Sequence, residues 1–454
     1  MMPSPLMPRR SPQLLVVALA FVAFVSLGLP DGLLGVGWPS MRAEFGRPLS
    51  QLGLLLGAGT AGYLTASFLA GQLVRAIGVG RVLVASSLMV TAALTGNCLA
   101  PAWGWLIVFA LMGGLGGGAI DAGINTFAAA RFSSRIVNWL HAFWGVGAST
   151  GPLLMTAILV HQHSWRLGYG IVAGVLGLLS ILFMLTLGLW RTDADADVAG
   201  AGAAAAGAAA GGSANAGDAA DGTAAAAESP RAVRAAPERT ASMAQALAQR
   251  AVWMQIALFF IYGGIETSAG QLFYTLFTET RGITPKVAGV TVSCYWAALT
   301  VGRILFGQLS ATLGHRAILR SGMILAPAAA ALLAWNPTPA LGLAGGVLLG
   351  LGLAPIFPTL ISATPSRVGH FHAAQAVGFQ VAGASVGVVV FPSLVTVLAR
   401  TMGLEVLGVY LIVASLVLLT MHEVTLRVSA AASLAATPHA SQTRLGRPLA
   451  GRLE

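Results

Sequence analysis

The chain has 454 residues, of which 56% are hydrophobic and only 9% are charged, and its mean hydropathy is +0.80. Soluble globular proteins carry about 25% charged residues, so this composition excludes a water-soluble fold. The formal net charge of +10 lies on short connections between apolar runs and not on one amphipathic element. That distribution excludes nucleic acid as the expected partner and is typical of a protein embedded in a lipid bilayer.

Apolar runs long enough to cross a membrane, which takes about 20 residues, recur along the whole chain. The first follows Arg9 and Arg10 as in a signal peptide, but it continues to about Trp38 without a small-residue cleavage site, so we expect a retained span. The twelve predicted spans are 13–36, 50–74, 81–100, 103–129, 136–160, 165–190, 251–277, 285–310, 316–335, 338–363, 371–398 and 404–426.

These runs predict an all-α membrane protein with twelve transmembrane helices in two six-helix bundles. The first bundle is expected at 1–190 and the second at 251–428. Between them, 191–250 is rich in Ala and Gly, too small to bury a core, and is expected to be a flexible cytoplasmic linker. The last residues, 429–454, are similar and are expected to form a cytoplasmic tail.

The basic residues predict the orientation. If both termini and the linker are cytoplasmic, 18 Lys and Arg lie on that side and 6 on the other. Long segments carry less weight, yet without the linker and tail the count is still 9 against 6. We therefore expect both termini in the cytoplasm.

The two halves repeat one another at a constant offset. GQLVRAIG at 71–78 returns as GQLSATLG at 307–314, GLG at 114–116 returns at 350–352, and GASTG at 147–151 returns as GASVG at 383–387. Three matches in register predict the parallel duplication found in transporters built from two related bundles. The small-xxx-small glycines, including GLGGG at 114–118, are interpreted as sites of close helix packing.

Three acidic residues lie well away from the ends of predicted spans: Asp31, Asp121 and Glu266. A charged Asp at the bilayer centre costs roughly 2.5–3.5 kcal/mol on insertion scales, so each is a candidate functional residue. At about 1.5 Å per residue, Asp121 lies roughly 12 Å from the cytoplasmic end of its span and Asp31 roughly 27 Å. These depths favour two separate positions along a transport path, one at each acid, over a single close pair of carboxyl groups.

Polar neighbours surround Asp121. Asn125, at i+4, shares its helix face, and Asn138 and His141 share a face of the next span. A proton-coupled carrier needs a carboxyl group that desolvation helps to protonate, together with groups that bind hydroxyls, and this set supplies both. Intramembrane Asn and His residues also form interhelical hydrogen bonds, and Asp31, after Pro30, could instead satisfy backbone groups freed by a kink.

Other side chains complete the expected site. Trp144 and Trp296 can stack on the apolar face of a sugar, and Gln380 is assigned to substrate binding. Arg303 is a cation within a span, whose carboxylate or carbonyl partner the sequence does not identify. Asp121 has no acidic counterpart in the repeat, where Phe357 occupies the matching position, so we place the chemistry on the asymmetric acid.

Enzyme chemistry is not expected. His141 has no Ser or Cys nucleophile at a recognisable spacing, and the two cysteines, Cys98 and Cys294, lie in apolar runs that indicate neither a disulfide nor a metal site. No cofactor is expected beyond a coupling ion.

Three motifs resemble those of the major facilitator superfamily, and within it the fucose permease-like branch of fucose–galactose–glucose:proton symporters. They are PDGLLGVGWP with Asp31, Asp121-x-x-x-Asn125 after a glycine run, and NWLHAFWGVGASTGP in the fifth span. The resemblance implies proton coupling and sugar binding at Asp31 and Asp121, with Asn125 and His141 lining the site. Glu266 is our third candidate for proton coupling.

The resemblance has departures. The Asp-Arg pair of the superfamily's Gly-x-Leu-x-Asp-Arg-x-Gly signature is replaced by Arg75-Ala76, and by Ala311-Thr312 in the repeat. Trp144 stands where the permease branch carries a polar residue. The expected protein is a monomer of a bacterial inner (plasma) membrane whose only partners are lipid and a small polar solute.

The expected function is secondary active transport by alternating access, with proton-coupled uptake of a sugar or similar small polar solute. Two alternatives remain open: an exporter of amphipathic compounds that uses the same acids for proton antiport, and a non-transporting membrane receptor or scaffold on the same fold.

Overall fold

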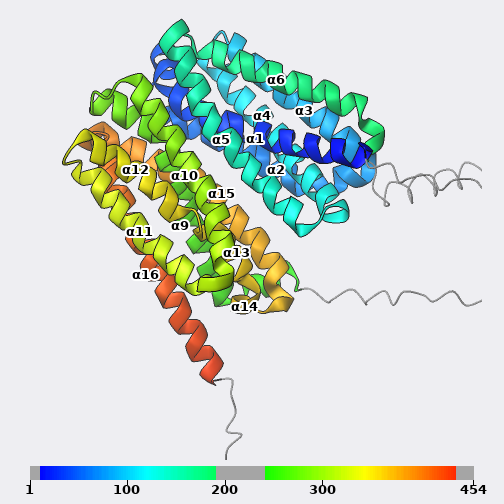
Figure 1. Cartoon of the computed structure of the whole chain (residues 1–454), viewed down its shortest axis with the longest axis vertical. Coiled ribbons are helices and arrows are strands. Elements are labelled where there is room, and N and C mark those ends of the chain that lie inside the picture. The colour runs from blue at the N-terminus through cyan, green and yellow to red at the C-terminus, as the bar shows by residue number, and fades with distance from the viewer. Residues whose placement is uncertain (1–10, 191–240, 436–454) are drawn as a thin grey trace, which may run out of the picture.

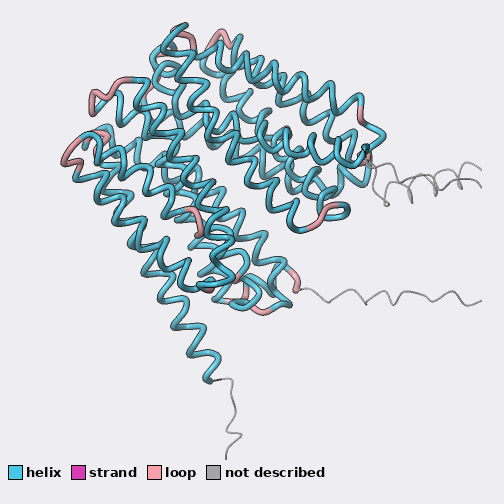
Figure 2. Tube along the Cα trace, viewed as in Figure 1, coloured by secondary structure: helices cyan, strands magenta, loops and turns pink. Residues whose placement is uncertain are grey.

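The structure, a computed structural model, describes residues 11–190 and 241–435. Among these residues, twelve helices are long and apolar enough to cross a membrane. Figure 1 shows them as two groups that lie side by side, and in Figure 2 the described chain contains helices and loops only. The predicted all-α membrane fold is confirmed.

The first group holds the spans of the N-terminal half. Its helices are α1 (Ser11–Glu44), η1 (Leu49–Gln51), α2 (Leu52–Ile77), α3 (Val79–Leu99), α4 (Trp103–Arg131), α5 (Ser134–Gln162), α6 (Trp165–Leu185) and η2 (Leu187–Leu189).

The second group holds the spans of the C-terminal half. Its helices are α8 (Met243–Leu247), α9 (Arg250–Thr275), the π-helix η3 (Leu276–Thr280), α10 (Pro285–Leu313), α11 (His315–Trp335), α12 (Pro339–Leu353), α13 (Ile356–Ser362), α14 (Thr364–Val368), α15 (His370–Met402) and α16 (Val406–Ala435).

The structure differs from the expected spans in two places. The first helix continues to Glu44 through Pro39, because Trp38 and Met41 are fully buried and packing holds this turn in place. The tenth span is interrupted between α12 and α13, where Pro355 lacks the backbone N–H that a continuous helix needs.

Only part of the expected linker and tail can be described. Residues 191–240 and 436–454 lie outside the described part of the chain. Within 241–250, α8 begins with a reciprocal capping box between Ser242 and Gln245, and α16 extends past residue 428 to Ala435.

Helix packing repeats between the halves. In the first, α2 packs on α4, α1 on α5 and α3 on α6. In the second, the corresponding pairs are α10 with α12, α9 with α15 and α11 with α16. The duplication predicted from short glycine motifs is therefore present as a repeated pattern of helix contacts.

Glycines let the paired helices approach closely at equivalent positions. A Cβ atom at Gly114 would lie 2.0 Å from the carbonyl oxygen of Gly59, and one at Gly350 would lie 2.4 Å from that of Tyr295. Gly350 and Tyr295 are the repeat counterparts of Gly114 and Gly59. Only glycine fits such crossings without moving a helix backbone.

The two halves contact each other mainly towards one end of the molecule. We call this the far end; the linker end is where α6 stops and α9 begins. Side chains at Gly53 and Gly289 would meet Ser393 and Thr156 of the opposite half, and Arg42 and Glu279 form an ion pair between α1 and η3. In Figure 1 the two groups of helices diverge towards the linker end.

Replacement of Gly114 by leucine should destabilise the first half, because its side chain has no room against α2. Overpacking of this kind typically costs about 1–3 kcal/mol. We expect a melting midpoint several degrees lower in detergent, measured by thermal unfolding. Gly104→Leu on the same helix is the control, since no atom lies within 4 Å of a Cβ there; equal melting of both variants would contradict the packing role.

Candidate functional site

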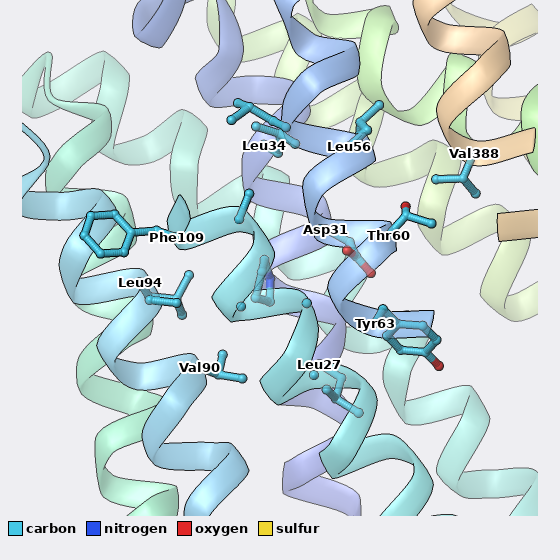
Figure 3. Close-up of a pocket in the computed structure, with 18 of the residues that line it drawn as sticks. Leu27, Asp31, Leu34, Leu56, Thr60, Tyr63, Val90, Leu94, Phe109 and Val388 are labelled. Atoms are coloured by element: carbon cyan, nitrogen blue, oxygen red, sulfur yellow. The ribbon is translucent and has the colours of Figure 1, made fainter. Parts of the chain in front are cut away.

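A cavity of about 520 Å³ lies between the halves. The first half supplies most of its wall, and the second contributes residues of α9, α13 and α15. Figure 3 shows Asp31, Thr60 and Tyr63 close together, with Val388 of α15 on one side and Phe109 and Leu94 on the other. The polar side chains that line it are Ser26, Asp31, Thr60, Tyr63, Asn97, Asp121, Trp144, Tyr169, Gln271 and Ser385.

Asp121 accepts hydrogen bonds from two neighbours. The Tyr63 hydroxyl donates to Oδ2 at 2.7 Å, and the Asn125 amide, one turn along α4, donates to Oδ1 at 3.0 Å. Tyr63 reaches this carboxyl group because α2 crosses α4 at Gly118, where a Cβ would lie 2.5 Å from the Tyr63 carbonyl oxygen. Glycine packing thus positions a hydroxyl group beside the intramembrane acid.

Asp31 lies on α1 with its side chain exposed to the cavity. Trp144 of α5 is a neighbour of this side chain and lines the same cavity. The backbone carbonyl of Asp31 accepts a hydrogen bond of 3.0 Å from the Gln271 amide of the opposite half. Asp31 and Asp121 thus line one cavity with different partners.

Glu266 pairs with Arg303, the partner that the sequence did not identify. The guanidinium nitrogen lies 3.4 Å from both carboxylate oxygens and 3.2 Å from the Tyr262 hydroxyl. Only 12% of the glutamate side chain and 25% of the arginine side chain are exposed. The two opposite charges, on α9 and α10, offset each other inside the membrane. This ion pair explains why an acid is tolerated at Glu266, whereas Asp31 and Asp121 have no basic partner of this kind among the described residues.

Aromatic side chains connect the halves beside this ion pair. The rings of Trp144 and Trp296 meet edge to face at 5.9 Å, and the Arg303 guanidinium carbon lies 5.8 Å from the centre of the Trp144 ring. Trp144 lines the cavity, whereas Trp296 is buried behind it.

Two of the remaining predicted residues, Asn125 and His141, lie outside the cavity wall. Asn125 acts through its bond to Asp121, and His141 is close enough to Asp121 and Arg303 to interact with them electrostatically. Asn138 belongs to α5, but its side chain lies outside what the structure describes.

The structure does not bring Gln380 to the cavity. Its side chain is fully buried near the linker end of the second half, where it bonds with Thr364 and Gln255. This network satisfies the amide within the bundle, so Gln380 does not line the proposed solute site.

Seven polar residues of the wall were not predicted as site residues from the sequence: Ser26, Thr60, Tyr63, Asn97, Tyr169, Gln271 and Ser385. Each is a single uncharged polar residue in an apolar run, a pattern that also fits an ordinary interhelical hydrogen bond. For Gln271 the sequence offers one indirect hint. It lies in the same span as Glu266, a little more than one helical turn further on.

Comparison with known proteins identifies the family. The family model described as Major Facilitator Superfamily matches residues 19–284 and again 256–450. The chain belongs to the Major Facilitator Superfamily. It is accordingly a multi-pass membrane transporter and not an enzyme, and the structure holds no cluster of three metal-ligating side chains among its described residues.

Relatives and solved structures agree with this placement. The chain is 21% identical over 348 residues to the glucose/mannose transporter GlcP of Bacillus subtilis (strain 168), spanning 75% of this chain and 78% of that protein. It is 27% identical over 149 residues to the major facilitator superfamily domain-containing protein 4A of Xenopus tropicalis, spanning 33% and 29%.

Two solved structures share the fold at low identity. The nucleoside transporter NupG superposes with a TM-score of 0.67 at 13% identity, covering 90% of this chain and 99% of that one. A bacterial homologue of the human lysosomal transporter Spinster, in an inward-facing and occupied conformation, gives 0.69 at 12% identity, covering 92% and 98%.

The Glu266–Arg303 pair makes a prediction for stability. Removal of one partner from a buried ion pair typically costs about 3–5 kcal/mol, whereas removal of both is far milder. We expect Arg303→Met to lower the melting midpoint strongly and the double variant Glu266→Gln/Arg303→Met to recover most of the loss. Additive effects of the two changes in a double-mutant cycle would show that the residues do not interact.

Proposed function

We propose that the chain is a proton-coupled symporter that takes up an uncharged, hydroxylated solute of the sugar class by alternating access. The proposed setting is a bacterial inner membrane with both termini in the cytoplasm, where the protein works as a monomer. The solute site is the cavity between the halves, with Asp31 and Asp121 as the coupling residues.

The observation that carries this proposal is the kind of polar group in the cavity wall. Two carboxyl groups line it, and the amide oxygens of Asn97 and Gln271 are buried there with no partner among the described residues. All four are acceptors for hydroxyl groups. None of the described residues in the wall is Lys or Arg, so the site favours a neutral solute over an anion.

Asp121 offers a route from proton binding to solute binding. While it is ionised, its two oxygens accept from Tyr63 and Asn125. A proton on Oδ2 adds a donor there and makes that oxygen a weaker acceptor, so the Tyr63 hydroxyl can accept from it or turn towards the cavity. Protonation would thereby change which groups face the solute, which is the coupling that a symporter requires.

The contacts between the halves support an alternating-access cycle. They gather towards the far end, which the excess of basic residues at the linker end would place outside the cell. The structure would then be open towards the cytoplasm. Opening the far end requires loss of the Arg42–Glu279 ion pair and of the contact between Gly53 and Ser393.

The sugar class draws its support from the relative GlcP, named as a glucose/mannose transporter, and from the acceptor-rich wall. The apolar residues of the same wall favour the alternative, an exporter of amphipathic compounds driven by proton antiport. Both candidates use Asp121, but they differ in the direction of flux and in the solute.

The test is solute flux in proteoliposomes with and without an inward proton gradient. We expect radiolabelled glucose to accumulate only with the gradient, at least 10-fold less in Asp121→Asn, and normally in Glu423→Gln. Glu423 is the control because it pairs with the exposed Arg320 and lies outside the cavity wall.

Two results would contradict the proposal. Gradient-driven extrusion of lipophilic dyes without sugar uptake would favour the exporter. Wild-type flux in Asp121→Asn for every solute tested would remove Asp121 from the mechanism.

A further inference from the structure

The cavity extends beyond the surfaces that the two halves present to each other. Part of its wall belongs to α3 and to the outer part of α4, which pack on each other inside the first half. In Figure 3, Val90, Leu94 and Phe109 lie on the opposite side of Asp31 from Val388. We call this extension the apolar arm; its wall is Val90, Ala93, Leu94, Leu106, Phe109 and Ala110.

One face of α4 connects the apolar arm to the carboxyl group of Asp121. Leu106, Ala110, Gly113, Gly117 and Asp121 follow one another at intervals of three or four residues, so they share a face of the helix. Along this face the wall changes from apolar side chains through glycines to the acid.

The two connecting glycines leave the passage open and do not serve close packing. A Cβ at Gly117 would have Leu27 Cδ2 as its nearest neighbour at 3.8 Å, and one at Gly113 would meet only Ala93 Cβ at 3.6 Å. Gly114 and Gly118 behave differently, since a Cβ there would lie within 2.0–2.5 Å of the α2 backbone. The packing role predicted for the whole glycine run therefore applies to only part of it.

A polar group lies at the other end of the apolar arm. Asn97 lines the cavity beside Leu94, and its Oδ1 atom is buried without a hydrogen-bond partner among the described residues. A buried amide oxygen without a hydrogen-bond partner destabilises the protein, and a donor on a bound molecule would offset part of that cost. The arm therefore combines an apolar wall with one acceptor.

We propose that the solute has two parts: a hydroxylated ring held at Asp31 and Asp121, and an apolar group about the size of a phenyl ring that fills the apolar arm. The substrate class is then a glycoside with an apolar aglycone, or a molecule of the same build. This proposal rests on the proposed sugar-class function. The cavity volume of about 520 Å³ lies within the range of sites that enclose drug-sized ligands.

The test compares ligands that differ only in the apolar group. The probes are methyl glucoside and 4-fluorophenyl glucoside, with 4-fluorobenzyl alcohol as a probe of the arm alone. Binding to the full chain in nanodiscs is followed by ¹⁹F NMR, with methyl glucoside measured by competition and empty nanodiscs as the blank.

The wild type should bind 4-fluorophenyl glucoside about 10-fold more tightly than methyl glucoside, a difference of about 1.4 kcal/mol. Gly113→Leu places a side chain in the arm and should reduce this ratio to below about 2-fold. Gly104→Leu, on the same helix but with open space around it, should keep the wild-type ratio. Phe109→Ala enlarges the arm and should shift the preference towards 2-naphthyl glucoside.

The outcomes separate this proposal from the function on which it rests. Equal affinity of the wild type for the two glucosides overturns the apolar arm and leaves sugar transport standing. Binding of 4-fluorobenzyl alcohol that is lost in Gly113→Leu, with no glucoside bound, supports the arm and overturns the sugar class. Equal weakening of both glucosides in Gly113→Leu also contradicts a separate arm.

Discussion

The cost of placing a carboxyl group within a membrane determines how the rest of this structure is arranged. Asp and Glu are tolerated in spans when they face water or find a partner, and the three acids use different solutions. Glu266 is paired with Arg303, Asp121 accepts bonds from Tyr63 and Asn125, and Asp31 faces the cavity. Since Glu266 and Arg303 offset each other's charge, we propose only the two acids of the first half as the groups that bind solute and proton.

Close helix packing provides the frame in which these acids act. Glycines at the crossing of α2 and α4 bring Tyr63 to Asp121, and the equivalent crossing of α10 and α12 has no acid to position. Phe357, the repeat counterpart of Asp121, lines the same cavity from the opposite half. The duplicated fold thus places a carboxyl group and an aromatic ring at equivalent positions of the two halves, and both line one cavity.

Fold and topology could be predicted from the sequence because the signals are long: apolar runs of about 20 residues and a repeat that relates the two halves in register. Asp31, Asp121 and Trp144 could be found because charged and large polar side chains are rare in spans. Thr60, Asn97 and Gln271 could not, since one uncharged polar residue in a span has many structural uses. The opposite case is Gln380, a polar residue within a span that we expected to bind solute. Its side chain instead forms hydrogen bonds inside its own bundle. Whether a glycine packs against another helix or lines the cavity depends on how its helix is rotated about its own axis. The spacing of residues in the sequence does not determine that rotation.

The central claim is that the contacts at the far end must break in every transport cycle. A disulfide between Gly53→Cys and Ser393→Cys tests it directly, because a Cβ at Gly53 would lie 3.0 Å from that of Ser393, near the roughly 3.5–4.5 Å of disulfides. In a chain with Cys98 and Cys294 replaced by serine, proton-driven glucose uptake is measured before oxidation, after it, and after reduction. We expect oxidation to abolish uptake and reduction to restore it; full uptake by the cross-linked protein would contradict alternating access through this end.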